Sequence, residues 1–110
     1  MIQKQSEGGY KTPVPGVEQK TLVYGERTLM AEFILKKGNL VPRHSHMHEQ
    51  TGYLVKGRIR IIIGSDQADL GPGGSWSIPG NVEHGAEALE DSVALEVFSP
   101  LREDYLPGRG

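Results

Sequence analysis

The chain has 110 residues, a formal net charge of −2, 24% charged residues and no cysteine. A chain of this length is expected to form one domain, which buries roughly 65% of its unfolded surface around one modest core. The charge balance gives no field that would attract nucleic acid or an anionic membrane surface, and no apolar run reaches the roughly 20 residues that span a bilayer. Without cysteine, any metal must be held by nitrogen and oxygen, and without a secretory signal the cytoplasm is the expected compartment.

Residues 1–16 mix polar side chains with several glycines and prolines. This composition predicts a flexible N-terminal arm, either frayed or exchanged as a strand with a second subunit.

From Val17 the chain becomes a series of short runs separated by turn residues, with no apolar stripe of helical period. Many short strands at regular spacing predict an all-β sandwich or closed barrel over residues 17–106. After Pro100 we expect a short helical turn that lays Arg102 over the barrel mouth, and a tail over residues 107–110. The expected strands cover residues 20–24, 29–37, 51–56, 58–63, 67–70, 75–78, 82–89 and 92–98.

Three of the four histidines, His44, His46 and His48, alternate along one segment that continues to Gln50. In an extended segment these side chains share one side, which makes a poor core but a good metal site. His44 and His46 would lie about 6.6 Å apart along a strand, whereas Gln50 would lie roughly 20 Å from His44 unless the chain bends between them. The remaining histidine, His84, must come from another strand.

Two spaced patterns resemble the motifs of the cupin superfamily: Gly38-x5-His44-x-His46-x3-Gln50-x6-Gly57 and Gly73-x5-Pro79-x-Asn81-x2-His84. The resemblance implies a single-domain cupin, a jelly-roll-like double-stranded β-barrel. It also implies one divalent transition metal ion (Ni, Zn, Fe, Mn or Co) bound by His44, His46, Gln50 and His84. Gln50 replaces the usual Glu, and Asn81 and Ala88 replace the usual Gly and Asn of the second motif. A shell of neutral ligands leaves the ion its full charge, which strengthens it as a Lewis acid and weakens its retention.

The segments HSHMHEQTGYLVKG (44–57) and NVEHGAEALEDSVALEVFSPLREDYL (81–106) resemble the KdgF-type cupins of pectin and alginate degradation. That family converts ring-form 4,5-unsaturated monouronates to linear keto forms. The resemblance places Glu96, Phe98 and Arg102 in the cavity beside the metal, although Asp is the commoner residue at position 96.

The side chains themselves fit these roles. Glu96 is a carboxylate in the middle of an apolar strand, which is unfavourable unless it is paired or functional. Arg102 offers the bidentate fork that matches a sugar carboxylate. We therefore expect Glu96 to transfer a proton, Arg102 to bind the carboxylate and Phe98 to form a wall of the pocket. A purely structural pair between Glu96 and Arg102 is the alternative.

Three other residues are interpreted without a catalytic role. His48 is expected to be a solvent-facing or hydrogen-bonded imidazole rather than a proton-handling residue. Trp76 is expected to be a packing residue, and Ile62 to be either half of a dimer contact or a scattered surface residue.

The sequence thus favours a metal-dependent enzyme that ketonises unsaturated uronates, with a sugar acid as its small-molecule substrate. Two alternatives remain open: a cupin dioxygenase with the same metal ligands, and a non-enzymatic sugar-acid-binding cupin. A homodimer is expected from the size of the family's members.

Overall fold

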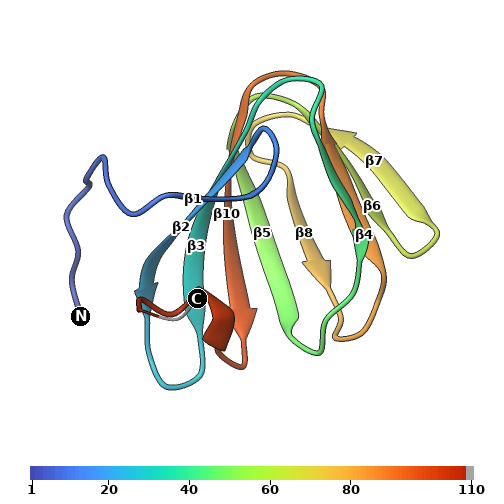
Figure 1. The fold of residues 1–110 in the computed structure, drawn as a ribbon. Helices are drawn as coiled ribbons and strands as arrows, with labels where there is room; N and C mark the ends of the chain where they lie inside the picture. The colour runs from blue at the N-terminus through green and yellow to red at the C-terminus, as the bar shows by residue number, and fades with distance from the viewer. Residues whose placement is uncertain (109–110) are drawn as a thin grey trace.

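The computed structural model describes residues 1–108 as two facing antiparallel sheets with one short 3₁₀ helix, which confirms the all-β fold (Figure 1). Residues 109 and 110 of the expected C-terminal tail lie outside the described residues. No helix within residues 1–108 is long and apolar enough to cross a membrane.

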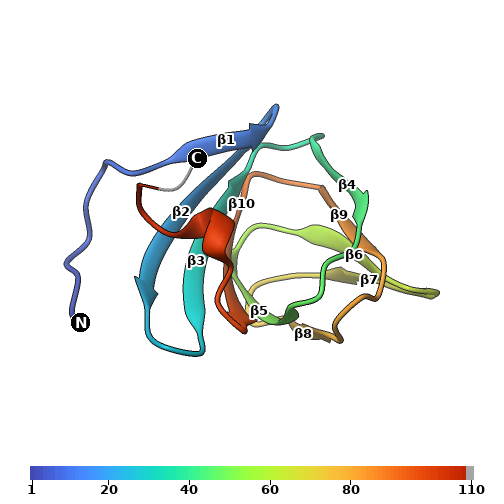
Figure 2. The same ribbon diagram turned by 60° about the horizontal axis from the view of Figure 1, so that its bottom comes forward.

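The larger sheet has six strands and the smaller one four, and together they enclose the centre of the molecule (Figure 2). In spatial order the larger sheet contains β1 (Lys11–Val14), β2 (Val17–Tyr24), β3 (Leu29–Leu35), β10 (Ser92–Ser99), β5 (Glu49–Lys56) and β8 (Ser75–Ile78). The smaller sheet contains β4 (Leu40–His44), β9 (His84–Ala88), β6 (Ile59–Ile63) and β7 (Asp66–Leu70). The helix is η1 (Glu103–Tyr105).

Alternating burial along the central strand β10 decides which side chains reach the interior. Ala94, Glu96 and Phe98 are buried, whereas the residues between them are only half-buried. The polar member of this set therefore points inward, while Val93, Leu95 and Val97 face outward. In an ordinary half-exposed strand the inward side chains are apolar and the outward ones polar, so an inward glutamate beside outward valines and leucine departs from that pattern.

Two strands were not expected from the sequence. β1 lies within the segment predicted to be a flexible arm, which corrects that prediction for residues 11–14, and β4 lies in a region with no predicted strand. Each contains a proline, Pro13 or Pro42, and each is an edge strand of its sheet. Proline cannot donate to a sheet ladder but is tolerated at an edge, so its presence did not prevent pairing.

The hydrophobic core is divided into three clusters around the barrel interior, rather than forming one continuous cluster. Their buried members are Leu54, Ile59, Ile61, Trp76, Ile78 and Ala94 in the first, Val17, Leu35 and Ala88 in the second, and Leu29, Ala31 and Phe98 in the third. This division leaves room for a cavity between the sheets.

The chain passes from the larger sheet to the smaller one at Gly57, between β5 and β6. Its φ of +93° favours glycine, and a Cβ there would lie 2.2 Å from Ser92 Oγ and 2.4 Å from the carbonyl oxygen of Asp91. Ser92 Oγ accepts a hydrogen bond from the backbone N–H of Arg58 at 3.1 Å, so it cannot move without breaking this junction.

We expect Gly57→Ala to destabilise the fold more than Gly38→Ala does. Gly38 has a similar φ of +86°, but a Cβ there would meet nothing within 4 Å. Gly38→Ala should cost about 1–2 kcal/mol from backbone strain alone, and Gly57→Ala a further ~1–3 kcal/mol from overpacking. Urea unfolding of both variants measures the difference, and equal losses would contradict the steric account.

Candidate metal centre and active site

Three chain segments meet at one end of the barrel. They are the connection from β4 to β5, the connection from β8 to β9, and η1, which lies beside them at the same end (Figure 1). His44 closes β4 and pairs directly with His84, the first residue of β9. The chain then leaves the smaller sheet and enters the larger one at Glu49, and the bend between them brings Gln50 towards His44 and His46.

The imidazoles of His44, His46 and His84 form one cluster. One nitrogen of each lies within 4.8 Å of the corresponding nitrogens of the other two. The ring centroid of His84 lies 4.3 Å from that of His44 and 4.9 Å from that of His46. Imidazole nitrogens on one ion lie at most about 4.2 Å apart, so a small contraction would complete a shared site.

Backbone carbonyls fix the tautomer of all three rings. The Nδ1–H of His44 donates to the carbonyl of Pro42 at 2.8 Å, and that of His84 to the carbonyl of Val82 at 2.8 Å. The Nδ1–H of His46 donates to the carbonyl of His48 at 3.0 Å. A carbonyl can only accept, so in each neutral ring Nε2 carries the free lone pair that a metal requires.

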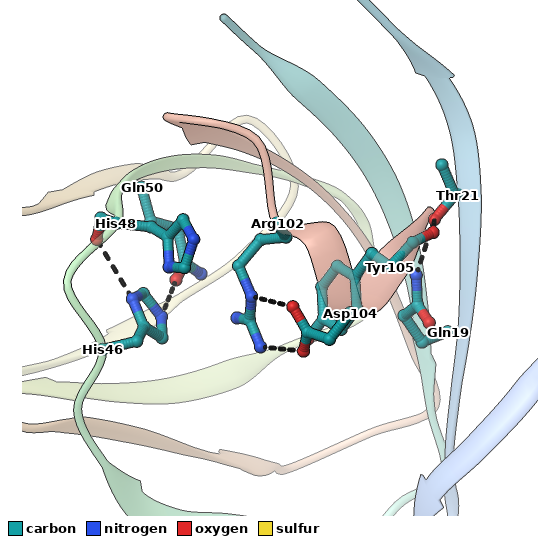
Figure 3. A network of polar contacts seen from close by, with 8 residues as sticks. All are labelled: Gln19, Thr21, His46, His48, Gln50, Arg102, Asp104 and Tyr105. Carbon is teal, nitrogen blue, oxygen red and sulfur yellow. Dashed lines mark hydrogen bonds and ion pairs between the residues drawn. The ribbon is translucent and has the colours of Figure 1, made fainter. Parts of the chain in front are cut away.

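The amide of Gln50 is also oriented (Figure 3). Its Nε2 donates to Glu96 at 2.8 Å. This bond turns Oε1 towards His46 Nε2 at 3.1 Å, the contact that Figure 3 shows. Gln50 Oε1 and His46 Nε2 are then both hydrogen-bond acceptors, and their lone pairs repel each other at this distance. A proton or a cation between the two atoms would make the contact favourable. Burial, with the nearby charges of Arg102 and His84, lowers the pKa of His46 and disfavours the proton.

His84 completes the fit of these residues to a cation. Its Nε2 is buried without a hydrogen-bond partner among the described residues, and such atoms are rare unless something binds them. Burial is the main cause that lowers the pKa of His84, which keeps the ring neutral. Three imidazole nitrogens and one amide oxygen suit Ni, Zn, Fe, Mn or Co.

Glu96 lies behind the histidine cluster and is almost completely buried. Trp76 Nε1–H donates to both of its oxygens, at 3.0 and 3.2 Å, in addition to the bond from Gln50. Burial raises the pKa of Glu96 to about 8, although both hydrogen bonds oppose the shift. A carboxyl group with a pKa near neutrality can both donate and accept a proton.

Arg102 and Phe98 form the other side of the site. The guanidinium lies over the ring of Phe98, 5.1 Å from its centroid, and over the ring of Tyr105 at 4.1 Å. Phe98 also contacts His46 edge-on, with ring centroids 5.9 Å apart. The aromatic rings therefore connect the arginine to the histidine cluster.

These groups, except His46, line a cavity of about 350 Å³ between the two sheets. This volume lies at the lower end of the range for small-molecule sites. Its polar lining consists of His44, Gln50, His84, Glu96 and Arg102.

The structure corrects one interpretation, argues against one alternative and adds one residue. His48 does not join His44, His46 and His84 in the cluster, because the chain bends at Met47 and His48. Glu96 and Arg102 do not pair, since Glu96 is bonded to Gln50 and Trp76 and Arg102 to Asp104. Trp76 packs in the core as expected but is also a hydrogen-bond donor to Glu96. Asp104 was missed, although its position two residues after Arg102 was a signal for an ion pair.

The chain belongs to the cupin domain family, whose model matches residues 31–99. Among curated proteins it is similar to the pectin degradation protein KdgF of Dickeya dadantii (strain 3937), with 29% identity over 93 residues. The match covers 83% of this chain and 84% of that protein.

Solved structures give the same relationship. KdgF from Halomonas sp. superimposes with a TM-score of 0.90 and 29% identity, covering 96% of this chain and all of that one. An RmlC-like cupin from Shewanella frigidimarina NCIMB 400 also reaches a TM-score of 0.90, at 24% identity, over 96% of this chain and 95% of that one, which supports the fold alone. The resemblance to KdgF-type cupins is thus confirmed.

We expect Ni²⁺ or Co²⁺ to raise the melting temperature of the protein, and His84→Ala to abolish the shift. A metal at a hundredfold excess over its Kd stabilises by about 2.7 kcal/mol, which corresponds to roughly 10 °C for a domain of this size. Each protein is compared with its own metal-free sample, and His48→Ala serves as the control that keeps the shift. A shift retained in His84→Ala would show that the ion binds elsewhere.

Proposed function

We propose that this protein is a metal-dependent enzyme that converts 4,5-unsaturated monouronates from pectin or alginate breakdown to their linear keto forms. Its similarity to two KdgF proteins, one of them described as a pectin degradation protein, supports the reaction class. The observation that carries the proposal is the arrangement of a three-histidine cluster, a buried carboxyl group and a partly buried guanidinium in one site beside a cavity.

His44, His46, His84 and Gln50 are the residues that would hold the divalent ion. When bound, it supplies Lewis acidity towards an oxygen of the substrate. The four protein ligands are neutral, so an anionic sugar acid meets no repulsion from the metal shell.

Glu96 is the residue that we assign to proton transfer. Conversion of an enol to a ketone moves a proton from oxygen to carbon, and ring opening requires another transfer at the ring oxygen. Trp76 and Gln50 hold the carboxyl group from two sides, so it is positioned before substrate arrives. The partners of Glu96 are all uncharged, which leaves its proton free to move rather than fixed by an ion pair.

Arg102 and Phe98 are assigned to substrate binding. The guanidinium provides charge and directional donors for the uronate carboxylate, and it lines the same cavity as Glu96. Phe98 is fully buried and forms an apolar wall between Arg102 and His46.

The test is turnover of an unsaturated galacturonate, followed by loss of its ultraviolet absorbance. We expect activity with added divalent metal, its loss in chelator and no oxygen uptake. Oxygen consumption coupled to turnover would instead indicate a cupin dioxygenase. Tight binding of the sugar acid without turnover would indicate a non-enzymatic binding protein.

Two substitutions should separate proton transfer from binding in the same assay. Glu96→Gln keeps the shape of the side chain and one acceptor oxygen but removes the acid, so kcat should fall by about 10²–10⁴ with little change in KM. Arg102→Ala should raise KM by about 10–100-fold, because it removes a charged hydrogen-bond donor to the carboxylate. Unchanged kinetics in Arg102→Ala would place the carboxylate elsewhere.

We also propose a homodimer formed through the outer face of the larger sheet. Tyr53 and Val55 of β5 are 50% and 45% exposed, next to the outward apolar side chains of β10. A twofold contact buries such a face against its own copy, and sedimentation would give twice the mass of the chain. Ile62 lies on the smaller sheet, away from this proposed contact, and its part in a dimer stays a prediction. The cytoplasmic location also stays a prediction.

A further inference from the structure

The guanidinium of Arg102 is held from one side by a neighbour that no part of the proposed reaction requires. Its Nε donates to Asp104 Oδ1 at 3.0 Å and its Nη2 to Asp104 Oδ2 at 2.7 Å, a bidentate pair (Figure 3). The side chain of Arg102 is only 14% exposed, whereas that of Asp104 is 57% exposed. The acid therefore approaches the guanidinium from the solvent side, while Arg102 itself lines the cavity.

The geometry leaves one particular edge of the arginine for a ligand. A guanidinium carries five N–H donors arranged along two usable edges. Asp104 occupies the edge formed by Nε and Nη2, so Nη1 and the second N–H of Nη2 form the edge that is left for a ligand, with the side chain of Tyr105 as a further hydrogen-bond neighbour of the guanidinium. The cation also lies against the rings of Tyr105 and Phe98, with 4.1 and 5.1 Å from Cζ to the ring centroids, and these two rings contact each other at 5.4 Å.

Asp104 is itself fixed to the barrel. It is the middle residue of η1, which is closed by a backbone hydrogen bond from Tyr105 N–H to the carbonyl of Arg102 at 2.9 Å. Thr21 Oγ1 on β2 donates to the carbonyl of Tyr105 at 2.6 Å and so ties the turn to the larger sheet (Figure 3). The position of the acid is therefore set by the fold rather than by the arginine.

We propose that Asp104 is a positioning residue for Arg102, which holds the guanidinium so that its Nη1 edge faces the cavity and receives the substrate carboxylate. This inference rests on the proposed function for the identity of the ligand, but not for the orientation of the arginine. The competing interpretation is an ordinary surface ion pair between near neighbours, and such pairs contribute little. Bidentate geometry, a mostly buried arginine and its two aromatic neighbours distinguish this pair from that case.

Asp104→Asn tests the proposal, with Glu103→Gln as the matched control. Glu103 is the preceding acid of the same turn, is exposed, and has no side-chain contact with Arg102 among those described. We expect Asp104→Asn to raise KM for the unsaturated uronate about 5–20-fold with kcat within twofold, and Glu103→Gln to leave both unchanged. In the Arg102→Ala background, Asp104→Asn should have no further effect, because the group it positions is gone.

A second measurement needs no substrate. The Nε–H signal of Arg102 in NMR should be ordered and protected from exchange in the wild type and in Glu103→Gln, and should lose both properties in Asp104→Asn. If the wild type does not turn over the uronate, the proposed function fails and this signal alone decides the positioning role. An unchanged Arg102 signal would overturn the inference, as would an unchanged or lower KM in Asp104→Asn or an additive effect in the double variant.

Discussion

Three hydrogen bonds from imidazole to backbone determine what the site can do. Each Nδ1–H of His44, His46 and His84 is committed to a carbonyl two residues away in the chain. Each ring is therefore locked in orientation and tautomer, and the three Nε2 lone pairs converge. Without these bonds the same histidines could rotate or exchange protons, and the cluster would be three weakly basic groups rather than a donor set.

A second chain of contacts connects this donor set to the acid of the site. Trp76 holds Glu96, Glu96 orients the amide of Gln50, and the amide directs its oxygen at His46. Gly52 leaves the space that Trp76 needs to reach Glu96, because a Cβ at this position would lie 2.1 Å from the indole. One buried carboxyl group thus serves both to orient a ligand and, in the proposed reaction, to transfer a proton.

The sequence predicted the parts of the fold that depend on alternation. Alternation in the sequence predicts that Leu29, Ala31, Phe33 and Leu35 share one side of a strand; in β3 three of them are buried and Phe33 is half-buried. The strands with Pro13 and Pro42 were missed, because proline argues against a strand unless its place at a sheet edge is known. That place depends on the order of strands in space, which no local pattern contains.

The sequence also predicted which residues gather at the site, but not all the contacts between them. Motif spacing selected His44, His46, Gln50 and His84, which the structure brings to one end of the barrel, although their role as ligands stays a proposal. The shared face of the alternating histidines does not extend to His48, because the chain bends at Met47 and His48, as the position of Gln50 required. The contacts of Trp76 with Glu96 and of Asp104 with Arg102 depend on side-chain direction in three dimensions, so composition and spacing could not reveal them.

The most direct test of this account is X-ray absorption spectroscopy of the purified protein loaded with one equivalent of Co²⁺ or Ni²⁺. The account predicts three imidazole nitrogens and at least one oxygen at about 2.0–2.2 Å from the ion. Two or fewer imidazoles in the coordination shell would contradict it.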